Sequence, residues 1–539
     1  MSLFGLFNIG KSAMFASRAA LSVVGHNIAN VNTPGYNKQD IVLNTANPVD
    51  IGSGYLGTGV NIAAIRRNYD RFIMNQLIGQ HQNTGRSYAL NRSLSQIEQI
   101  FNEVKETGLA SSITDYFKAW QEVSVNPDSR THRIVLLNKA NSLVHLAKRF
   151  ENEISENLKN IDETIEDIVN RINKLASDIA SLNKSIVYLE AGSEIKKAND
   201  LRDQRDNLLN ELSSLAEVSS YEDKNGALVV VMGMKNLVNA ENTNLLTTRL
   251  NEEGHRDIYL DGANITDRIT KGQIGGFIDV RNDIESNILT KFRRLIASIS
   301  KEVNLIHRTG YGLDASTGND FFNHLQLTTK VLSLGANMTA SIRDLSQLTL
   351  DEYEIRFDAS NNYNVYNIQT GNIVASGSYI SGDIISFEGI DVIITGTVSS
   401  SDRFIISPLK DAIRNFGLAI SDIEKIAASS SDITLPGDNT NAIAISEIFE
   451  KSIENLGERT FMDYYRGLIS DIGIMSRTAS DSLRFDENML REIQNWRESV
   501  SGVSLDEEAA NLIRYQRSFE AAARMIRVTD ELMEVILNL

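Results

Sequence analysis

The sequence has no cysteine and very little proline. Its 539 residues contain no cysteine and only five prolines. The first absence excludes disulfide bonds, thiolate metal sites and cysteine nucleophiles, although it does not exclude an extracellular location. The second leaves room for long uninterrupted helices, because proline breaks a helix more strongly than any other residue.

Positive charge and long apolar runs are also scarce. The formal net charge is −17 and no long run of Lys or Arg offsets it, which disfavours nucleic acid and anionic lipid as partners. The most apolar stretch, 19–24, is interrupted by Ser22 and is far shorter than the roughly 20 residues of a membrane helix. We therefore expect a soluble protein with no membrane partner and no cleaved signal peptide.

Length and composition indicate a globular protein of several domains. A chain of 539 residues exceeds the usual size of one hydrophobic core, so about three or four domains are expected. Hydrophobic residues make up 42% of the chain and charged residues 23%, which argues against wholesale disorder.

Both ends of the chain carry a helical seam. Apolar or small residues recur at alternating intervals of four and three, a pattern typical of helices that pack along a narrow stripe. At the N-terminal end they are Leu3, Phe7, Gly10, Met14, Ser17, Leu21, Val24, Ile28 and Val31. At the C-terminal end they are Leu505, Leu512, Tyr515, Phe519, Ala522, Ile526, Met533 and Ile536, with Thr529 as a polar interruption. We expect the two ends to pair as a coiled coil.

A third heptad pattern lies in the middle of the chain. It runs through Ile154, Leu158, Ile161, Ile165, Ile168, Ile172, Leu175, Ile179, Leu182, Ile186 and Leu189. Gly192 then offers a helix stop, and apolar spacing over 195–215 predicts a second helix that folds back. An intermolecular coiled coil is the alternative, but the second helix provides a partner within the chain, so we favour a helical hairpin.

Strand patterns interrupt the helical ones. A turn at 223–226 precedes a strand-like run at 228–232, and helix is expected again from about 278 to 306. Between about 326 and 408 short strands such as 373–375, 384–387 and 392–394 are separated by turn residues. A loop at 428–441 then leads back to helices from about 442.

These patterns predict a multidomain α+β protein of elongated form. Its terminal helices pair as a coiled coil, a rod domain is built from long helices, and a β-rich domain is inserted. We expect a terminal assembly domain at 1–65 plus 500–539, and a helical rod domain at 66–217 plus 266–325 plus 436–499. The β-rich insertions are expected at 218–265 and 326–435.

A turn motif follows the N-terminal seam. In residues 27–36, "NIANVNTPGY", Pro34 disfavours helix at Thr33 and Gly35 tolerates a positive φ, so a helix stop explains the residue types. The same segment resembles the motif shared by flagellar rod, hook and hook-associated axial proteins, and "GTGVNIAAIRRNYDRF" at 57–72 resembles its continuation. The motif residues carried over are Asn27, Asn30, Asn32, Thr33, Pro34, Gly35 and Tyr36.

The C-terminal end and three internal segments strengthen this resemblance. "SGVSLDEEAANLIRYQRSFEAAARMI" at 501–526 resembles the C-terminal helix of the same family, and Ser504 with Glu507 forms a capping-box pattern. "GGFIDVRND" at 275–283, "EVNLIHRTGYGLDASTGNDFF" at 302–322 and "PGDNTNAIAI" at 436–445 are similar to the hook-associated, junction-forming branch. The region 326–435 matches only in general style.

The resemblance implies a structural role outside the cell. It implies a subunit exported unfolded by the flagellar type III apparatus, which assembles at the distal end of the hook, forms the hook–filament junction and folds its terminal helices on assembly. Implied partners are copies of itself, hook protein on the proximal side, hook-associated protein 3 on the distal side, and an export chaperone on the C-terminal region. No catalysis and no cofactor are implied.

Patterns that point to chemistry are weak. The glycines of 52–57 fit GxGxxG but lack a surrounding strand and helix, so a turn is expected. The seven histidines show no metal-ligand spacing, and Asp314 and Asp320 miss the spacing of a calcium loop, so we expect no catalytic, cofactor or metal residues. Alternatives are an enzyme hidden in the β-rich region, a secreted adhesin or effector, and, within the structural class, a hook protein.

Overall fold

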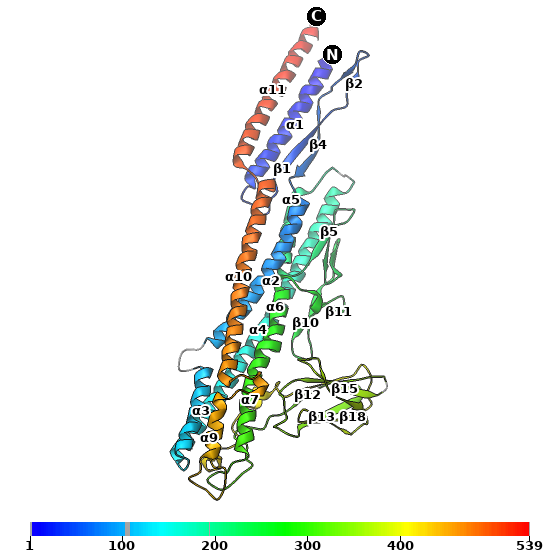
Figure 1. Cartoon of the computed structure of the whole chain (residues 1–539). Helices are drawn as coiled ribbons and strands as arrows, with labels where there is room; N and C mark the ends of the chain where they lie inside the picture. Colours follow the sequence, from blue (N-terminus) through cyan, green and yellow to red (C-terminus); the bar gives the residue numbers. More distant parts are fainter. Residues whose placement is uncertain (1–2, 103–107, 193–194, 360, 538–539) are drawn as a thin grey trace. The chain divides into compact units, whose positions relative to one another are not determined.

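A computed structural model describes residues 3–102, 108–192, 195–359 and 361–537 (Figure 1). The chain forms two compact units. The first contains Met1–Arg92, Ile161–Asp279 and Thr478–Leu539, and the second contains Ser93–Asn160 and Val280–Arg477. Four helices have residues in both units: α2 (Arg71–Phe101), α4 (Arg130–Glu190), α6 (Gly272–Asp283) and α10 (Phe461–Ser501).

The first unit brings the two ends of the chain together. Helix α1 (Leu3–Ala29) packs against helix α11 (Leu505–Leu537), and the N and C marks lie near each other in Figure 1. Strand β1 (Gln39–Thr45) pairs antiparallel with β4 (Val60–Arg67), and both strands contact α1. The short strands β2 (Val49–Asp50) and β3 (Tyr55–Leu56) extend this hairpin. Of the turn expected at 52–57, residues 52–54 connect β2 to β3, whereas Tyr55 and Leu56 form β3 itself.

A helical hairpin forms the body of the same unit. The C-terminal half of α4 lies beside α5 (Asn199–Leu215), because Arg171 donates to Glu211 over 2.8 Å and Arg205 donates to Asn183 over 3.0 Å. The heptad positions of α4 are buried, except that Leu182 is half-buried and Leu189 is exposed. These contacts lie within one chain, which agrees with the intramolecular interpretation.

Two small antiparallel sheets complete the first unit. One has the order β5 (Ser219–Glu222), β6 (Leu228–Met232), β7 (Lys235–Asn239) and β8 (Asn242–Thr243). The other contains β9 (Leu246–Leu250), β10 (Arg256–Leu260) and β11 (Ala263–Asn264), followed by the 3₁₀ turn η1 (Thr266–Arg268). The strand predicted at 228–232 is confirmed at those residues.

The second unit has a helical part with an aromatic core. Its further helices are α3 (Leu109–Val125), α7 (Thr290–His307), α8 (Ala412–Asn415) and α9 (Thr440–Glu447), with the 3₁₀ turns η3 (Ile423–Lys425), η4 (Ile448–Glu450) and η5 (Glu454–Leu456). Tyr116 and Trp120 of α3 pack with Phe321, and all three side chains are fully buried. The helix expected from about 278 begins earlier, at Gly272, and contains the π-helical turn η2 (Ile284–Leu289).

The second unit also holds a β-sandwich. Strands β12 (Thr328–Leu332), β19 (Arg403–Ser407), β14 (Tyr353–Phe357), β15 (Asn362–Asn367) and β16 (Ile373–Ser378) form one sheet in that order. Strands β13 (Ala336–Ile342), β18 (Ile390–Gly396) and β17 (Ile384–Phe387) form the other. Buried side chains of both sheets share one core. The strands expected at 373–375, 384–387 and 392–394 are confirmed.

The fold is therefore mixed α and β, with long helices and β-rich parts. Within the residues that the structure describes, no helix combines the length and the apolar character that crossing a bilayer requires.

Candidate assembly interface

The pairing of α1 with α11 is close and antiparallel. A Cβ atom built on Gly10 would lie 2.9 Å from the Ile526 side chain and 3.6 Å from the Ala522 carbonyl oxygen. Toward the opposite end of α1, Asn27 donates from its amide nitrogen to a Glu508 carboxylate oxygen over 3.0 Å. Glycine at position 10 thus lets the two helix backbones approach one another.

The buried face of α1 is turned partly away from the predicted seam. Its buried residues are Gly10, Ala16, Ser17, Ala20, Val23, Val24 and Asn27. Among the predicted seam residues Gly10, Ser17 and Val24 are buried, whereas Leu3, Phe7, Met14, Leu21 and Ile28 are half-buried. Val31 lies beyond the end of the helix, in the turn that follows. The reason is that α1 packs against two neighbours, α11 and the β1–β4 hairpin, so its buried face is wide.

The seam of α11 is less covered, because α1 is its neighbour on one side only. Ala522 is buried, and Tyr515, Phe519, Ile526 and Met533 are half-buried, while Leu505, Leu512 and Ile536 are exposed. Thr529, the polar interruption, is buried and donates its hydroxyl to the Met525 carbonyl over 2.7 Å. The interruption is therefore satisfied within its own helix.

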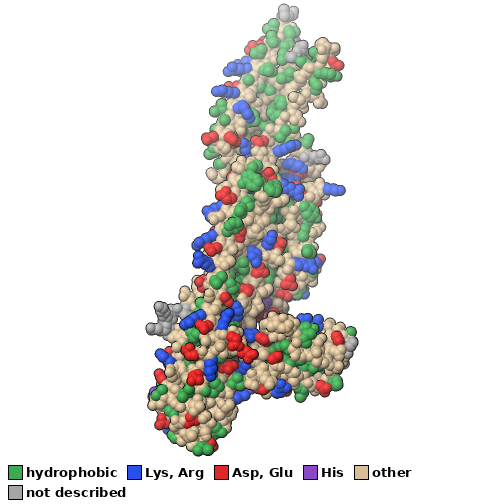
Figure 2. Space-filling model, viewed as in Figure 1, with side chains coloured by type: hydrophobic (Ala, Val, Ile, Leu, Met, Phe, Trp, Pro, Cys, Tyr) green, Lys and Arg blue, Asp and Glu red, His purple; other side chains and the backbone are tan. Residues whose placement is uncertain are grey.

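A second apolar stripe of α11 faces away from α1. Its members, spaced by three and four residues, are Met525, Val528, Leu532 and Val535, with side chains 40–57% exposed. Figure 2 shows hydrophobic side chains reaching the surface on this part of the molecule. Large exposed apolar residues in a helical stripe are typical of a surface that packs against another chain.

Asn27 of the turn motif uses its whole hydrogen-bonding capacity. It is 1% exposed, and its amide nitrogen donates to the Gln39 carbonyl over 2.9 Å and to Glu508. Its amide oxygen accepts from the Tyr36 hydroxyl over 2.8 Å and from the Gln39 N–H over 3.0 Å. A buried amide has two donors and two acceptor sites, so this position is fully satisfied only when the helix end, the turn and α11 are all in place.

The remaining motif residues shape the turn. Asn30 donates to the His26 carbonyl and accepts from the Thr33 hydroxyl, while Asn32, Thr33 and Pro34 are exposed. Gly35 has a φ of +75°, and a Cβ atom there would lie 1.7 Å from the Asn207 side chain, which itself donates to the Pro34 carbonyl. Both backbone conformation and space therefore require glycine at position 35.

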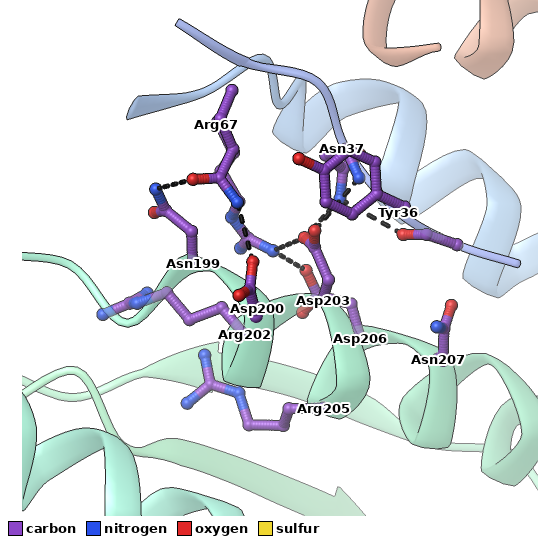
Figure 3. Close-up of polar contacts among 12 residues, drawn as sticks. Tyr36, Asn37, Arg67, Asn199, Asp200, Arg202, Asp203, Arg205, Asp206 and Asn207 are labelled. Carbon is purple, nitrogen blue, oxygen red and sulfur yellow. Dashed lines mark hydrogen bonds and ion pairs between the residues drawn. The ribbon is translucent and has the colours of Figure 1, made fainter. Parts of the chain in front are cut away.

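Helix α5 anchors this turn through a row of polar side chains (Figure 3). Asp203 accepts from the Asn37 backbone N–H over 3.0 Å and from its side-chain amide over 2.5 Å. Arg67 of β4 donates to Asp203 over 2.6 Å and to Asp206 over 2.7 Å. Burial lowers the pKa of Arg67, but the two carboxylates outweigh it and raise the pKa overall. One turn of α5 thus binds both the motif and the hairpin.

A second ionic cluster continues from α5 into the neighbouring sheet. Arg202 donates to Glu190 over 2.7 Å and to Glu222 over 2.8 Å, and Arg205 also pairs with Glu222. Burial raises the pKa of Glu190, but its hydrogen bonds from Arg202, the Ala198 N–H and Lys197 outweigh this and lower it to about 2. These charges are paired, so they hold elements together and are not free for acid–base chemistry.

Sequence reasoning missed the polar half of this interface. The apolar seams did not include Glu508 or the carboxylates of α5, although "RDQRD" at 202–206 places charges on one helix face at a spacing of three and four. That pattern identifies a charged face, but it does not say whether the face is solvated or buried.

Among the described residues, no group of three or more His, Asp and Glu side chains is arranged to hold a metal ion. An open cavity of about 770 Å³ lies between β4, α2, α5 and β5, and no histidine lines it.

Comparison with known families matches models along most of the chain. Residues 7–37 match the flagella basal body rod protein model, and 498–539 match the C-terminal model of the flagellar basal body rod FlgEFG proteins. Residues 94–322 match the helical domain of flagellar hook-associated protein FlgK, and 328–408 match the D2-like domain of flagellar hook-associated protein 1. The N-terminal match covers most of α1, and the C-terminal match covers α11.

Full-length relatives and a solved structure agree with these matches. Flagellar hook-associated protein 1 of Escherichia coli is 28% identical over 99% of both chains. The protein of the same name from Bacillus subtilis is 28% identical over 100% of this chain and 98% of its own. The flagellar hook junction protein FlgK from Burkholderia pseudomallei has the same fold, with a TM-score of 0.69, 18% identity, and coverage of 79% of this chain and 100% of that chain.

The family matches and the full-length relatives identify the class as structural components of the extracellular bacterial flagellum. Within that class, the chain belongs to the flagellar hook-associated protein 1 family. Proteins of this family are structural components and not enzymes, as the sequence resemblance implied.

Proposed function

We propose that this chain is a structural subunit of the hook–filament junction, which assembles at the distal end of the hook through its terminal helices. The observation that carries the proposal is the pairing of the two chain ends beside the axial-family turn, in a chain related over its full length to hook-associated protein 1. The geometry supports an assembly role because α1 and α11 bury one face against each other, whereas the second apolar stripe of α11 is exposed.

The partners follow from this role. Copies of the same chain would cover the second apolar stripe of α11. Hook protein would bind on the proximal side and hook-associated protein 3 on the distal side. An export chaperone would bind the C-terminal region before assembly. An exposed apolar stripe promotes aggregation of a free subunit, which is the physical reason for a chaperone on the C-terminal region.

Folding of the terminal helices is coupled to assembly in this proposal. The chain is exported unfolded by the flagellar type III apparatus, and the absence of cysteine suits such passage because no cross-link forms in it. Most seam residues of α11 are half-buried or exposed when α1 is its helical neighbour. Each Leu, Ile or Phe that becomes fully buried contributes about 1.5–3 kcal/mol, so further copies supply the free energy that orders the ends.

The domain division also belongs to this proposal. Residues 1–65 plus 500–539 act as the assembly domain, with α1 and α11 as a coiled coil. Residues 66–217, 266–325 and 436–499 form the helical rod, and 218–265 and 326–435 are β-rich insertions. The four-three spacing of both terminal seams supports the coiled coil.

The test places a charge in the seam. Leu21→Asp or Phe519→Asp should leave the rest of the chain folded, as judged by near-ultraviolet circular dichroism, but should prevent incorporation at the hook tip. Ser22→Asp and Gln516→Asp add the same charge at exposed positions of the same helices and serve as controls. Electron microscopy of hooks, together with the amount of unassembled protein in the medium, measures incorporation. Normal filament attachment in both seam variants would contradict the proposal.

A further inference from the structure

A buried polar cluster lies at one end of the apolar helix pair. Glu508 of α11 and Asn27 of α1 are each 1% exposed, and they are joined by the 3.0 Å hydrogen bond described above. Lys38, which follows the turn, lies 3.4 Å from Glu508 and 3.0 Å from the exposed Glu507. A carboxylate buried in a helix pair is costly unless it is paired, so its place must be specific.

The apolar seams by themselves do not determine how the helices align. Because both seams repeat every seven residues, sliding α11 by one heptad again places apolar residues opposite apolar residues. Such a slide moves the helix by about 10 Å along its axis. The contact of Gly10 with Ile526 and that of Asn27 with Glu508 fit the same antiparallel alignment to within one residue.

A slide of one heptad would leave the buried carboxylate without partners. In one direction Glu508 would come to lie opposite Leu21, away from Asn27 and Lys38. Phe519 would then face Gly10, where even an added Cβ atom would lie 2.9 Å from the Ile526 side chain. The loss of a partner for a buried charge costs several kcal/mol, and crowding at Gly10 adds to that cost. The polar cluster and the close approach at Gly10 therefore discriminate between alignments that the heptad spacing alone leaves equivalent.

We propose that Asn27 and Glu508 are positioning residues that fix the register of the terminal helix pair. The inference rests on the proposed function, because a shifted α11 would present its second apolar stripe about 10 Å from the position at which a neighbouring subunit meets it. Since Asn27 also binds Tyr36 and Gln39, the same residue links the register of the helices to the shape of the turn.

Disulfide trapping measures the register directly, because the chain has no cysteine of its own. Ser17→Cys is combined with Phe519→Cys for the observed alignment, or with Leu512→Cys or Ile526→Cys for a slide of one heptad in either direction. Cysteines displaced by about 10 Å are too far apart to form a disulfide. Intrachain disulfides are quantified by gel mobility on the full-length chain, both in flagella sheared from cells and as purified protein.

In the parent background, the 17–519 pair should form at least about ten times more disulfide than either shifted pair. Glu508→Leu should reduce this preference several-fold, and Glu508→Gln, which keeps the hydrogen bond from Asn27, should restore it. Glu520→Leu makes the same change at an exposed position of α11 and should leave the preference intact.

An unchanged preference in Glu508→Leu would overturn the inference, as would the absence of 17–519 trapping in the parent chain in both preparations. For a variant that no longer assembles, the trapping ratio is measured on the purified chain. The proposed function fails separately, through normal incorporation of the seam variants, and that result would leave the trapping ratio unaffected.

Discussion

Asn27 and His307 are buried polar residues that are held by complete sets of hydrogen bonds. Asn27 in the first unit uses all four positions of its amide. His307 in the second unit is fully buried, lies 2.7 Å from the Asn319 carbonyl through one ring nitrogen and accepts the Ala427 N–H over 3.0 Å through the other. The histidine is therefore neutral in the folded chain, with its proton on Nδ1, because protonation of the other nitrogen would break the second bond.

The protonation of His307 makes the stability of the second unit depend on pH. Burial lowers the pKa of His307 from 6.5 to about 4. Its contribution is therefore complete above about pH 6.5 and is lost as the pH falls from there to about 4, by up to about 3 kcal/mol. Trp120 packs edge-to-face on this ring, so its fluorescence in a Trp496→Phe background reports denaturant unfolding of the unit.

His307→Phe is the matched variant for that measurement. It should be less stable than the parent at pH 7, because it loses both hydrogen bonds, but it should lose less stability between pH 6.5 and 4. If the free energy of unfolding depended on pH equally in the two chains, groups other than His307 would be responsible for the loss of stability at low pH.

At the scale of elements, polar contacts join the turn and the hairpin to the helical body. Asp203 holds Asn37 and Arg67, and nearby Gln39 donates to Asp200 over 2.7 Å. The backbone N–H of Lys38 donates to the Ser501 carbonyl over 2.8 Å, so the end of α10 also meets the motif. Hydrogen bonds, unlike apolar contacts, require particular partners, so this interface determines which residues of the turn, the hairpin and the helical body meet.

Removal of one member of this row should destabilise the first unit. Asp203→Ala leaves Asn37 without its acceptor and reduces the pairing of buried Arg67, so a loss of about 2–4 kcal/mol is expected. Glu211→Ala, which breaks an exposed ion pair of the same helix with Arg171, should cost less than about 1 kcal/mol. Unfolding followed by Trp496 in a Trp120→Phe background measures both. Equal small losses would mean that α5 does not hold the turn in the isolated chain.

At the scale of the whole molecule, helix α11 is covered much less than the central part of α4. The exposed apolar positions of α11 contrast with the buried heptad positions of α4 over 154–179. Local stability follows the amount of buried apolar contact, so regions of one chain differ in how readily they open. A subunit that completes its terminal helices on assembly needs this difference.

Hydrogen exchange should reveal this gradient in the isolated chain. Amides of α1 and α11 should exchange faster than those of 154–189 and 199–215, because an isolated helix pair with an open apolar stripe is marginal in water. In assembled junctions the same terminal amides should become protected. Uniform protection of the free chain would indicate ends that fold without neighbours.

The sequence by itself determined the family, the helices at both ends, the hairpin of α4 with α5 and the strands compared above. It could do so because heptad spacing, strand runs and the turn motif are local patterns. Only the tertiary structure decided the buried face of α1, the partners of Asn27 and Asp203, and the burial of Glu508. The sequence around a charged residue does not show whether its side chain is solvated or buried. Its burial depends on which distant element of the chain covers it.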